Sequence, residues 1–123
     1  MSGEPSIVED RPISSGEAEL ITWLLREAST IGDATHLLPT ISDLHVVKRC
    51  GCGCPTVEFA WEGQLTAPAT IVADAYGETE DGVSVGIILW AHGNQISELE
   101  LYEQSGPVRS LPSGASLRPM FPT

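Results

Sequence analysis

Apolar side chains recur at helical spacing over residues 14–29. At 100° per residue the large apolar positions fall on one arc of a helix, and polar positions fall on the opposite arc. Ser14 and Glu17 have the spacing of a capping box, in which both side chains accept hydrogen bonds from backbone N–H groups of the first turn. Gly32 follows as a natural stop. The pattern predicts one amphipathic helix, whose apolar face carries Leu20, Ile21, Leu24, Leu25, Ala28 and Ile31.

After residue 43 the period of the pattern changes from that of a helix to that of strands. The segments with strand-like alternation are separated by short turns, and the Gly93-Asn94 pair is typical of a tight turn between antiparallel strands. Segment 83–91 is apolar on both faces at Ile88 and Trp90, which predicts a central strand covered on both sides. We therefore predict an α+β domain, with the N-terminal helix packed on a mostly antiparallel sheet of about five strands. The predicted strands are 44–49, 56–61, 70–76, 83–91 and 96–102.

Both ends of the chain differ in character from the middle. Residues 1–12 are polar and have only Ile7 and Val8 to bury, so we expect a loose lead-in. Residues 105–123 are rich in Pro, Gly and Ser, which predicts an extended or irregular arm across the sheet or an oligomer partner. Residues 13–104 are expected to form a single α+β domain, since the chain has the size of one domain.

The chain is acidic, with 17 Asp and Glu against six Lys and Arg and a net charge of −11. This charge disfavours nucleic acid and anionic membranes as partners and is compatible with a basic protein, a metal ion or a cationic ligand. A solvated acidic surface is the simpler interpretation of the excess. We expect a protein partner or a homodimer.

Several absences indicate a cytoplasmic protein. No window approaches the roughly 18 consecutive apolar residues of a membrane-spanning helix. Residues 1–10 contain no apolar run typical of a secretory signal. The three cysteines are odd in number and tightly clustered, which disfavours a secreted disulfide framework. We therefore expect a reducing cytosol.

All three cysteines lie between the first two predicted strands, in a Cys-Gly-Cys-Gly-Cys-Pro segment at 50–55. On a straight strand their sulfurs would share one face about 7 Å apart, too far to bind one ion. The two glycines permit a fold in which the sulfurs converge. Zinc prefers four Cys or His ligands. The candidate zinc ligands are Cys50, Cys52, Cys54 and His45, with His36, His92 or a carboxylate as alternatives for the fourth position.

Two other interpretations of this segment stay open. A redox or nucleophilic role would use one of the thiols, although the chain has no C-x-x-C pair and its spacing places no His beside a thiol. An architectural role would make the segment a Gly-rich bend whose thiols behave as small buried hydrophobes. The spacing favours the architectural role.

The remaining motifs do not form a catalytic set. Glu98 and Glu100 lie on one face of a predicted strand and have the spacing of a paired carboxylate site. Because they alternate with Leu99 and Leu101, a solvated strand face explains them better. Glycine-rich phosphate motifs and G-x-S-x-G are absent.

Several segments of the chain carry a resemblance to known proteins. They are Arg-Pro-Ile-Ser at 11–14, Glu17, Glu-Leu-Ile at 19–21, residues 46–55, residues 82–90 and Ser-Glu-Leu-Glu-Leu-Tyr at 97–102. These segments resemble small uncharacterised bacterial proteins that carry a domain of unknown function. The resemblance covers most of residues 11–103, and the Cys-Gly-Cys-Gly-Cys-Pro run is its most specific part. It implies a bacterial cytosolic domain and assigns no catalytic residue.

These features lead to three hypotheses about function. The first is a small non-enzymatic domain that binds a protein partner or a ligand, because a well-patterned helix and sheet lack a catalytic set. The second is a metal-binding or thiol-dependent protein that uses the cysteines at 50–54. The third is an acidic immunity or antitoxin-like protein that neutralises a basic toxin, which rests on charge and size alone.

Overall fold

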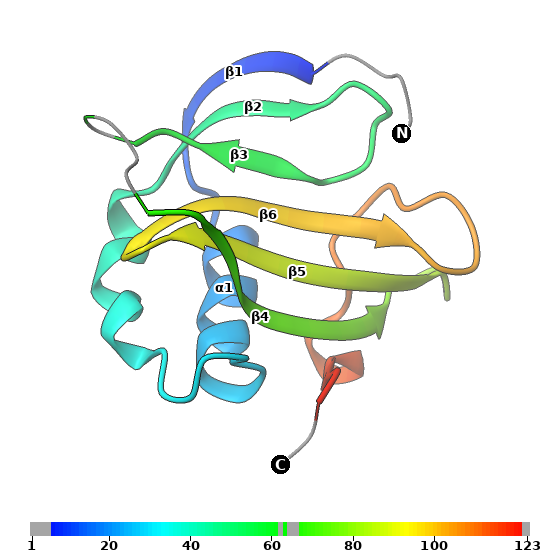
Figure 1. The fold of residues 1–123 in the computed structure, drawn as a ribbon. Coiled ribbons are helices and arrows are strands. Elements are labelled where there is room, and N and C mark those ends of the chain that lie inside the picture. The colour runs from blue at the N-terminus through cyan, green and yellow to red at the C-terminus, as the bar shows by residue number, and fades with distance from the viewer. Residues whose placement is uncertain (1–5, 62, 64–66, 122–123) are drawn as a thin grey trace.

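The computed structural model describes residues 6–61, 63 and 67–121. A first strand is followed by two helical segments and then by strands joined by loops and turns, and the C-terminal arm ends with a short strand at one edge of the sheet (Figure 1). The elements are β1 (Ser6–Pro12), α1 (Ser15–Glu27), η1 (Thr35–Asp43), β2 (His45–Cys50), β3 (Val57–Phe59), β4 (Ala69–Glu78), β5 (Ser84–His92), β6 (Gln95–Glu103), η2 (Gly114–Ser116) and β7 (Arg118–Pro119).

The strands form one antiparallel sheet in the order β1-β2-β3-β6-β5-β4-β7. The predicted α+β class with an antiparallel sheet is confirmed. The sheet has seven strands, however, instead of about five. The five predicted strands correspond to β2 to β6, and the two additional ones, β1 and β7, form the edges of the sheet.

Strand β1 lies within the residues expected to be a loose lead-in. Residues 6–12 pair with β2, whereas residues 1–5 lie outside the described part of the chain. The strand buries little apolar surface, since Val8 is 81% exposed, and this is why apolar alternation does not reveal it. Polar contacts to β2 hold it instead, including an ion pair of 2.6 Å between Glu9 and Arg49.

Helix α1 begins as predicted. The backbone N–H of Glu17 donates to Ser14 Oγ at 3.1 Å, and the N–H of Ser14 donates to Glu17 Oε1 at 2.9 Å, which completes the capping box. Arg11 donates to both oxygens of Glu17 at 2.9 Å. The N–H groups of Ser14 and Glu17 and the carboxylate of Glu17 therefore all have hydrogen-bond partners where the chain passes from β1 into α1.

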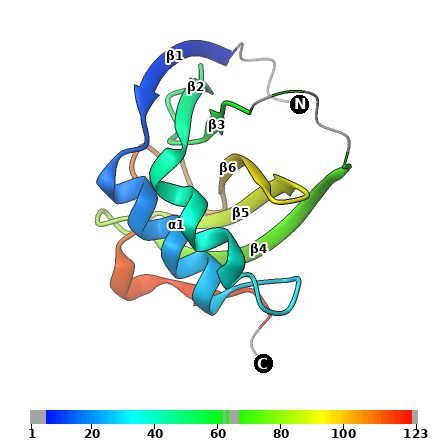
Figure 2. The ribbon, with the colours of Figure 1, turned by 90° about the vertical axis from the view of Figure 1, so that its left-hand side faces the viewer.

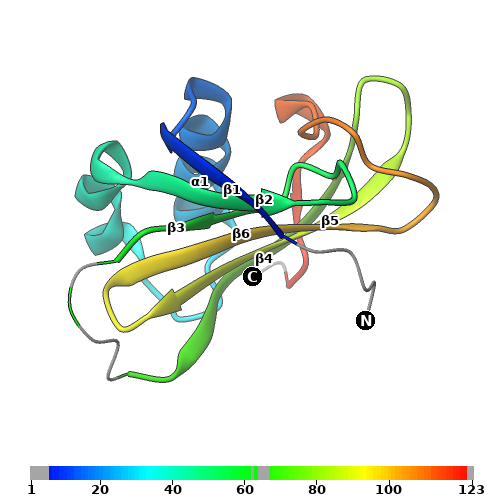
Figure 3. The ribbon, with the colours of Figure 1, turned by 90° about the horizontal axis from the view of Figure 1, so that it is seen from above.

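The helices cover only one face of the sheet. Figure 2 shows α1 and η1 side by side in front of the sheet, and Figure 3 shows both on the same side of it. The core lies between these layers, where Ile87 and Leu89 of β5 are fully buried. On the opposite face Ile88 and Trp90 are only half-buried. The expectation that β5 is covered on both sides is therefore wrong.

The C-terminal arm packs against the domain. Val108 is fully buried and Leu117 is 6% exposed. The arm turns through η2 and pairs as β7 with residues 75–76 of β4 (Figure 1). Two apolar anchors and a short backbone pairing thus hold a segment whose composition is otherwise that of a loop.

Candidate metal centre

The chain between β2 and β3 folds into a compact turn. The N–H of Cys50 donates to the carbonyl of Thr56 at 3.1 Å, and the N–H of Gly53 donates to the carbonyl of Cys50 at 3.4 Å. Gly53 has a φ of 93°, in the left-handed region where a side chain is strained. The turn therefore departs from the straight strand in which alternate sulfurs lie about 7 Å apart.

The turn brings the three predicted thiols together. Their sulfur atoms all lie within 4.8 Å of one another, and each residue is half-buried. The sulfurs of Cys50 and Cys52 are 2.7 Å apart, with one thiol hydrogen between them. The structure therefore confirms a cysteine cluster at 50–54 and supplies the convergence that the spacing alone leaves open.

Backbone N–H groups point at two of the sulfurs. The N–H of Cys52 donates to Cys50 Sγ at 3.4 Å, and the N–H of Cys54 donates to Cys52 Sγ at 3.3 Å. Donors of this kind stabilise the thiolate over the thiol. These two backbone groups therefore favour the thiolate form of the sulfur that each one contacts.

Thr56 fixes the end of the turn to the sheet. Its Oγ1 accepts from the N–H of Leu101 at 2.9 Å and donates to the carbonyl of Leu101 at 3.1 Å. The thiol of Cys54 donates to the same Oγ1 at 3.5 Å. A rigid strand, β6, thus positions the third thiol.

The shared hydrogen separates the acidities of the first two thiols. The hydrogen bond with Cys52, together with burial, raises the pKa of Cys50 to about 12. The same hydrogen bond lowers the pKa of Cys52, and the nearby positive charge of Arg109 adds to this effect. The Arg109 side chain lies over the turn, where a Cβ at Gly53 would be 3.9 Å from its Nε. The pair of thiols therefore loses one proton more readily than the other, and a bound metal would displace the proton that is held more tightly.

The structure does not bring His45 to the thiols. His45 begins β2 and Cys50 ends it, so they are about 17 Å apart along the strand. His45 Nε2 instead lies 2.5 Å from Asp10 Oδ1. His92 Nδ1 lies 2.9 Å from the carbonyl oxygen of Ala67. Within the described residues, the group of converging ligand atoms contains the three sulfurs and no fourth His, Cys, Asp or Glu.

A cavity of about 190 Å³ lies beside Cys50. Thr56, Glu58 and Glu98 line it, and so do the basic residues Lys48 and Arg49. Sequence reasoning assigns Glu98 to a solvated face, but burial, with the charges of Glu100 and Glu58, raises its pKa to about 7. Glu98 lies directly opposite Glu58 because of the β3–β6 register. That register is a long-range property that the alternating pattern does not contain.

No family model, curated protein or solved structure matches the chain. Among the helices of the described residues, none has both the length and the apolar character required to cross a membrane. The candidate site therefore rests on its own geometry.

Proposed function

We propose that the protein binds a thiophilic metal ion, zinc in the first instance, through the thiolates of Cys50, Cys52 and Cys54. One observation carries the proposal. Three sulfurs that a regular strand would hold apart converge to within 4.8 Å of one another. The function is binding without turnover, and it requires a reducing compartment that keeps the thiols free.

The distances between the sulfurs support a tetrahedral zinc site. A Zn–S bond of about 2.3 Å places neighbouring sulfurs about 3.8 Å apart around the ion. The sulfurs of Cys50 and Cys52 are 2.7 Å apart, so binding would part them by about 1 Å. Small rotations about χ1 of half-buried side chains supply such a shift without movement of the backbone.

Three protein ligands leave one position of a tetrahedral ion for water or for a group from another molecule. Structural zinc sites usually have four protein ligands, whereas sites with an exchangeable position have three. Copper(I) is the competing occupant, because it is softer than zinc and prefers thiolates. The same binding experiment distinguishes the two ions.

The local positive charge favours the three thiolates and their complex with zinc. Zinc with three thiolates carries a net charge of −1, and the guanidinium of Arg109 lies near Cys52, where it lowers the pKa of that thiol. Binding releases the protons that the thiols still hold, including the one on Cys50. We therefore expect the zinc affinity to rise with pH across the neutral range.

The test uses protein purified without an affinity tag, reduced, stripped of metal and dialysed against zinc or copper(I). Elemental analysis should find about one equivalent of zinc per chain. The variant C50S/C52S/C54S should bind less than about one tenth of an equivalent.

His45→Gln is the matched control, because His45 contacts Asp10 at the far end of β2. It should bind as much zinc as the wild-type protein. Wild-type protein that binds no more zinc than the triple variant would contradict the proposal. If the wild-type protein binds copper(I) in preference to zinc, copper(I) is the ion that the three thiolates bind.

A second function, thiol–disulfide exchange, is favoured by the 2.7 Å separation of Cys50 and Cys52. The Cys52 thiolate would attack oxidised glutathione and release one glutathione thiolate. Cys50 would then lose its proton and displace the second glutathione, which leaves a Cys50–Cys52 disulfide. Mass spectrometry should show a loss of about 2 Da in wild-type and C54S protein and a mixed disulfide in C50S/C54S, which has no second thiol to displace the glutathione. A stable mixed disulfide in the wild-type protein would contradict this route.

A further inference from the structure

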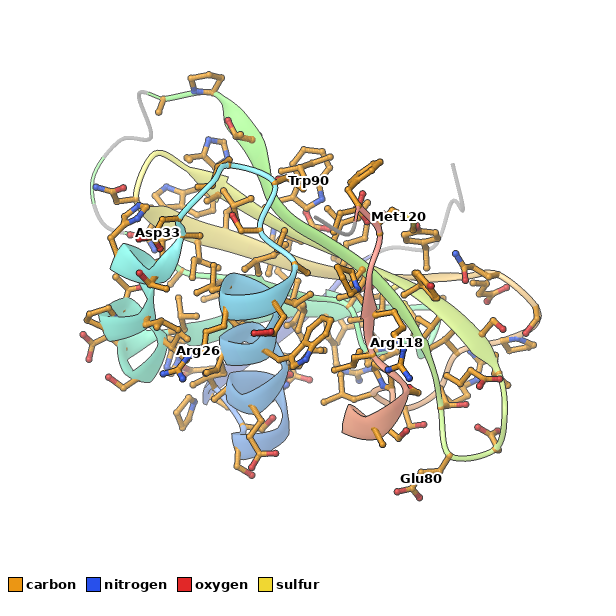
Figure 4. All side chains as sticks on the ribbon, turned by 90° about the horizontal axis from the view of Figure 1, so that it is seen from below. Arg26, Asp33, Glu80, Trp90, Arg118 and Met120 are labelled. Atoms are coloured by element: carbon orange, nitrogen blue, oxygen red, sulfur yellow. The ribbon has the colours of Figure 1, made fainter. Side chains whose placement is uncertain are left out.

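The sheet face opposite α1 carries carboxylates and aromatic rings, and no helix of the described residues covers it (Figure 3). Figure 4 shows Trp90 and Met120 on this side of the sheet, away from α1. The strand register places Glu98 between Glu58 and Trp90, and places Glu100 opposite Ile88. We name this surface the acidic–aromatic face; its principal members are Glu58, Asp74, Trp90, Glu98, Glu100 and Tyr102.

The carboxylates of this face are crowded. Glu58 and Glu98 lie directly opposite each other on neighbouring strands, and Glu100 follows two residues later on the same face. Like charges in such positions destabilise a sheet. The raised pKa of Glu98 reflects burial and these neighbours. The face therefore gathers carboxyl groups whose full ionisation would cost folding free energy.

Asp74 adds an acceptor to the same face. Its Oδ1 is buried and has no hydrogen-bond partner among the described residues. Burial raises the pKa of this carboxyl. This side of the sheet therefore holds one acceptor without a partner among the described residues, while Lys48 pairs in register with Glu58.

Aromatic rings lie between the carboxylates. The indole Nε1 of Trp90 donates to Glu100 Oε1 at 2.8 Å, which fixes a ring beside a carboxylate. The ring of Tyr102 lies over Gly86, where a Cβ would be 1.9 Å from the ring's Cζ. Guanidinium groups bind such surfaces well, because they stack on aromatic rings and donate two parallel hydrogen bonds to a carboxylate.

We propose that the acidic–aromatic face docks an arginine-rich segment of another protein. Charge complementarity selects this occupant, since the chain has a net charge of −11 and four carboxylates belong to the face. A second copy would place the same carboxylates against themselves across a two-fold axis. This proposal does not rest on the metal function: the binding groups are carboxylates and rings, although Cys50 lines the same cavity as Glu58 and Glu98.

The test measures binding of a synthetic oligo-arginine peptide by titration calorimetry at low salt. The face variant is E58Q/E98Q/E100Q, in which amides keep the shape of the side chains. The control variant is E19Q/E27Q/E80Q, which changes net charge equally at exposed positions outside the face. Glu80, for example, lies at the turn between β4 and β5 (Figure 4). Comparing the face variant with the control variant distinguishes peptide binding at the acidic–aromatic face from general electrostatic attraction of a basic peptide to an acidic protein.

The face variant should bind the peptide about tenfold more weakly, and the control variant should match the wild-type protein within about twofold. An oligo-lysine peptide of equal length should bind less tightly than oligo-arginine, since lysine lacks the planar fork. Equal weakening in the two variants would overturn the proposal. A wild-type dimer in light scattering that dissociates in the face variant would also overturn it in favour of a second copy.

Two controls keep this result separate from folding and from the metal site. Thermal unfolding of the face variant should occur at or above the wild-type temperature, because like charges have been removed. The variant C50S/C52S/C54S should bind the peptide as the wild-type protein does. Loss of peptide binding in that cysteine variant would contradict an independent surface.

Discussion

At the start of α1, burial opposes ionisation of Glu17, but hydrogen bonds from Arg11 and from the N–H of Ser14 outweigh it and leave the pKa below its usual value. On the open face of the sheet, Glu98 is also partly buried, yet its charged neighbours are Glu58 and Glu100, and its pKa is raised to about 7. Glu17 has counter-groups from its own chain, whereas Glu98 faces charges like its own.

This difference between Glu17 and Glu98 distinguishes two kinds of group. Glu17, whose partners come from its own chain, stabilises the fold, whereas Glu98, whose neighbours carry like charges, is available for binding. In the Arg11–Glu17–Ser14 cluster, both carboxylate oxygens of Glu17 already accept hydrogen bonds from groups of the same chain. Cys50 and the acidic–aromatic face adjoin one cavity, which Glu58 and Glu98 line together with the basic residues Lys48 and Arg49. The thiols and the carboxylates of the face are the groups whose complement is a cation or a basic partner.

The largest expected effect on stability comes from removing the Glu17 side chain from the Arg11–Glu17–Ser14 cluster. Glu17→Ala should lower the free energy of unfolding at pH 7 by about 2 to 3 kcal/mol, because it removes a helix cap and leaves Arg11 without its carboxylate. Chemical denaturation measures the change. Glu19→Ala, on the exposed side of the helix, should change it by less than about 0.5 kcal/mol.

The same variant has a defined pH dependence. The folded-state pKa of Glu17 is lowered, so its contribution is complete above the unfolded value of about 4.3 and is lost as pH falls through the folded value. The difference between wild-type protein and Glu17→Ala should therefore shrink in acid below about pH 4. A difference that stays constant to lower pH would contradict the ion-pair explanation.

On the open face, Gly86→Ala should lower the free energy of unfolding by about 2 kcal/mol, since the new methyl group would displace the Tyr102 ring. The double variant Gly86→Ala/Tyr102→Ala should be more stable than the sum of the single changes predicts. Strict additivity in the double-mutant cycle would show that the ring does not pack on Gly86.

Glu98 should give the protein a pH dependence of the opposite sign. Because its folded-state pKa is raised to about 7, stability falls as pH rises from the unfolded value of about 4.3 through 7. With allowance for solvent screening, the loss should be about 1 to 2 kcal/mol, and Glu98→Gln should remove it. Glu80→Gln, at an exposed turn, should keep the wild-type slope. An unchanged slope in Glu98→Gln would show that the carboxylates of this face do not interact as described.

The smallest effect concerns the backbone of the cysteine turn. Gly53→Ala should cost about 1 kcal/mol, because its φ of 93° strains a residue with a side chain. It should also weaken zinc binding, since the turn brings the sulfurs together. Gly114→Ala is the matched control: residue 114 has open space and no left-handed φ. Similar losses for the two variants would show that the turn does not depend on the conformation of Gly53.

Local signals in the sequence were sufficient for the helix and the central strands. Ser14 and Glu17 lie three residues apart, and a capping box needs nothing beyond that spacing. Strand β5 is evident because Val85, Ile87 and Leu89 alternate toward a single buried face. Strand β1 has no such signal, because an edge strand held by backbone pairing and ion pairs buries few apolar side chains.

The geometry of the candidate site could not be predicted from residue spacing, because it depends on backbone conformation and on strand register. The sequence shows that Cys50, Cys52 and Cys54 are close along the chain, but the backbone at Gly53 decides whether their sulfurs converge. His45 was a reasonable fourth ligand by residue type, yet it shares β2 with Cys50, and an extended strand holds the two ends apart. The crowding of Glu58 and Glu98 depends on strand register.

X-ray absorption at the zinc edge, on zinc-loaded wild-type protein, tests the metal-binding proposal most directly. The predicted coordination is three sulfurs at about 2.3 Å and one nitrogen or oxygen at about 2.0 to 2.1 Å. A shell made only of nitrogen and oxygen, or one with a single sulfur, would contradict binding by the converging thiols of Cys50, Cys52 and Cys54.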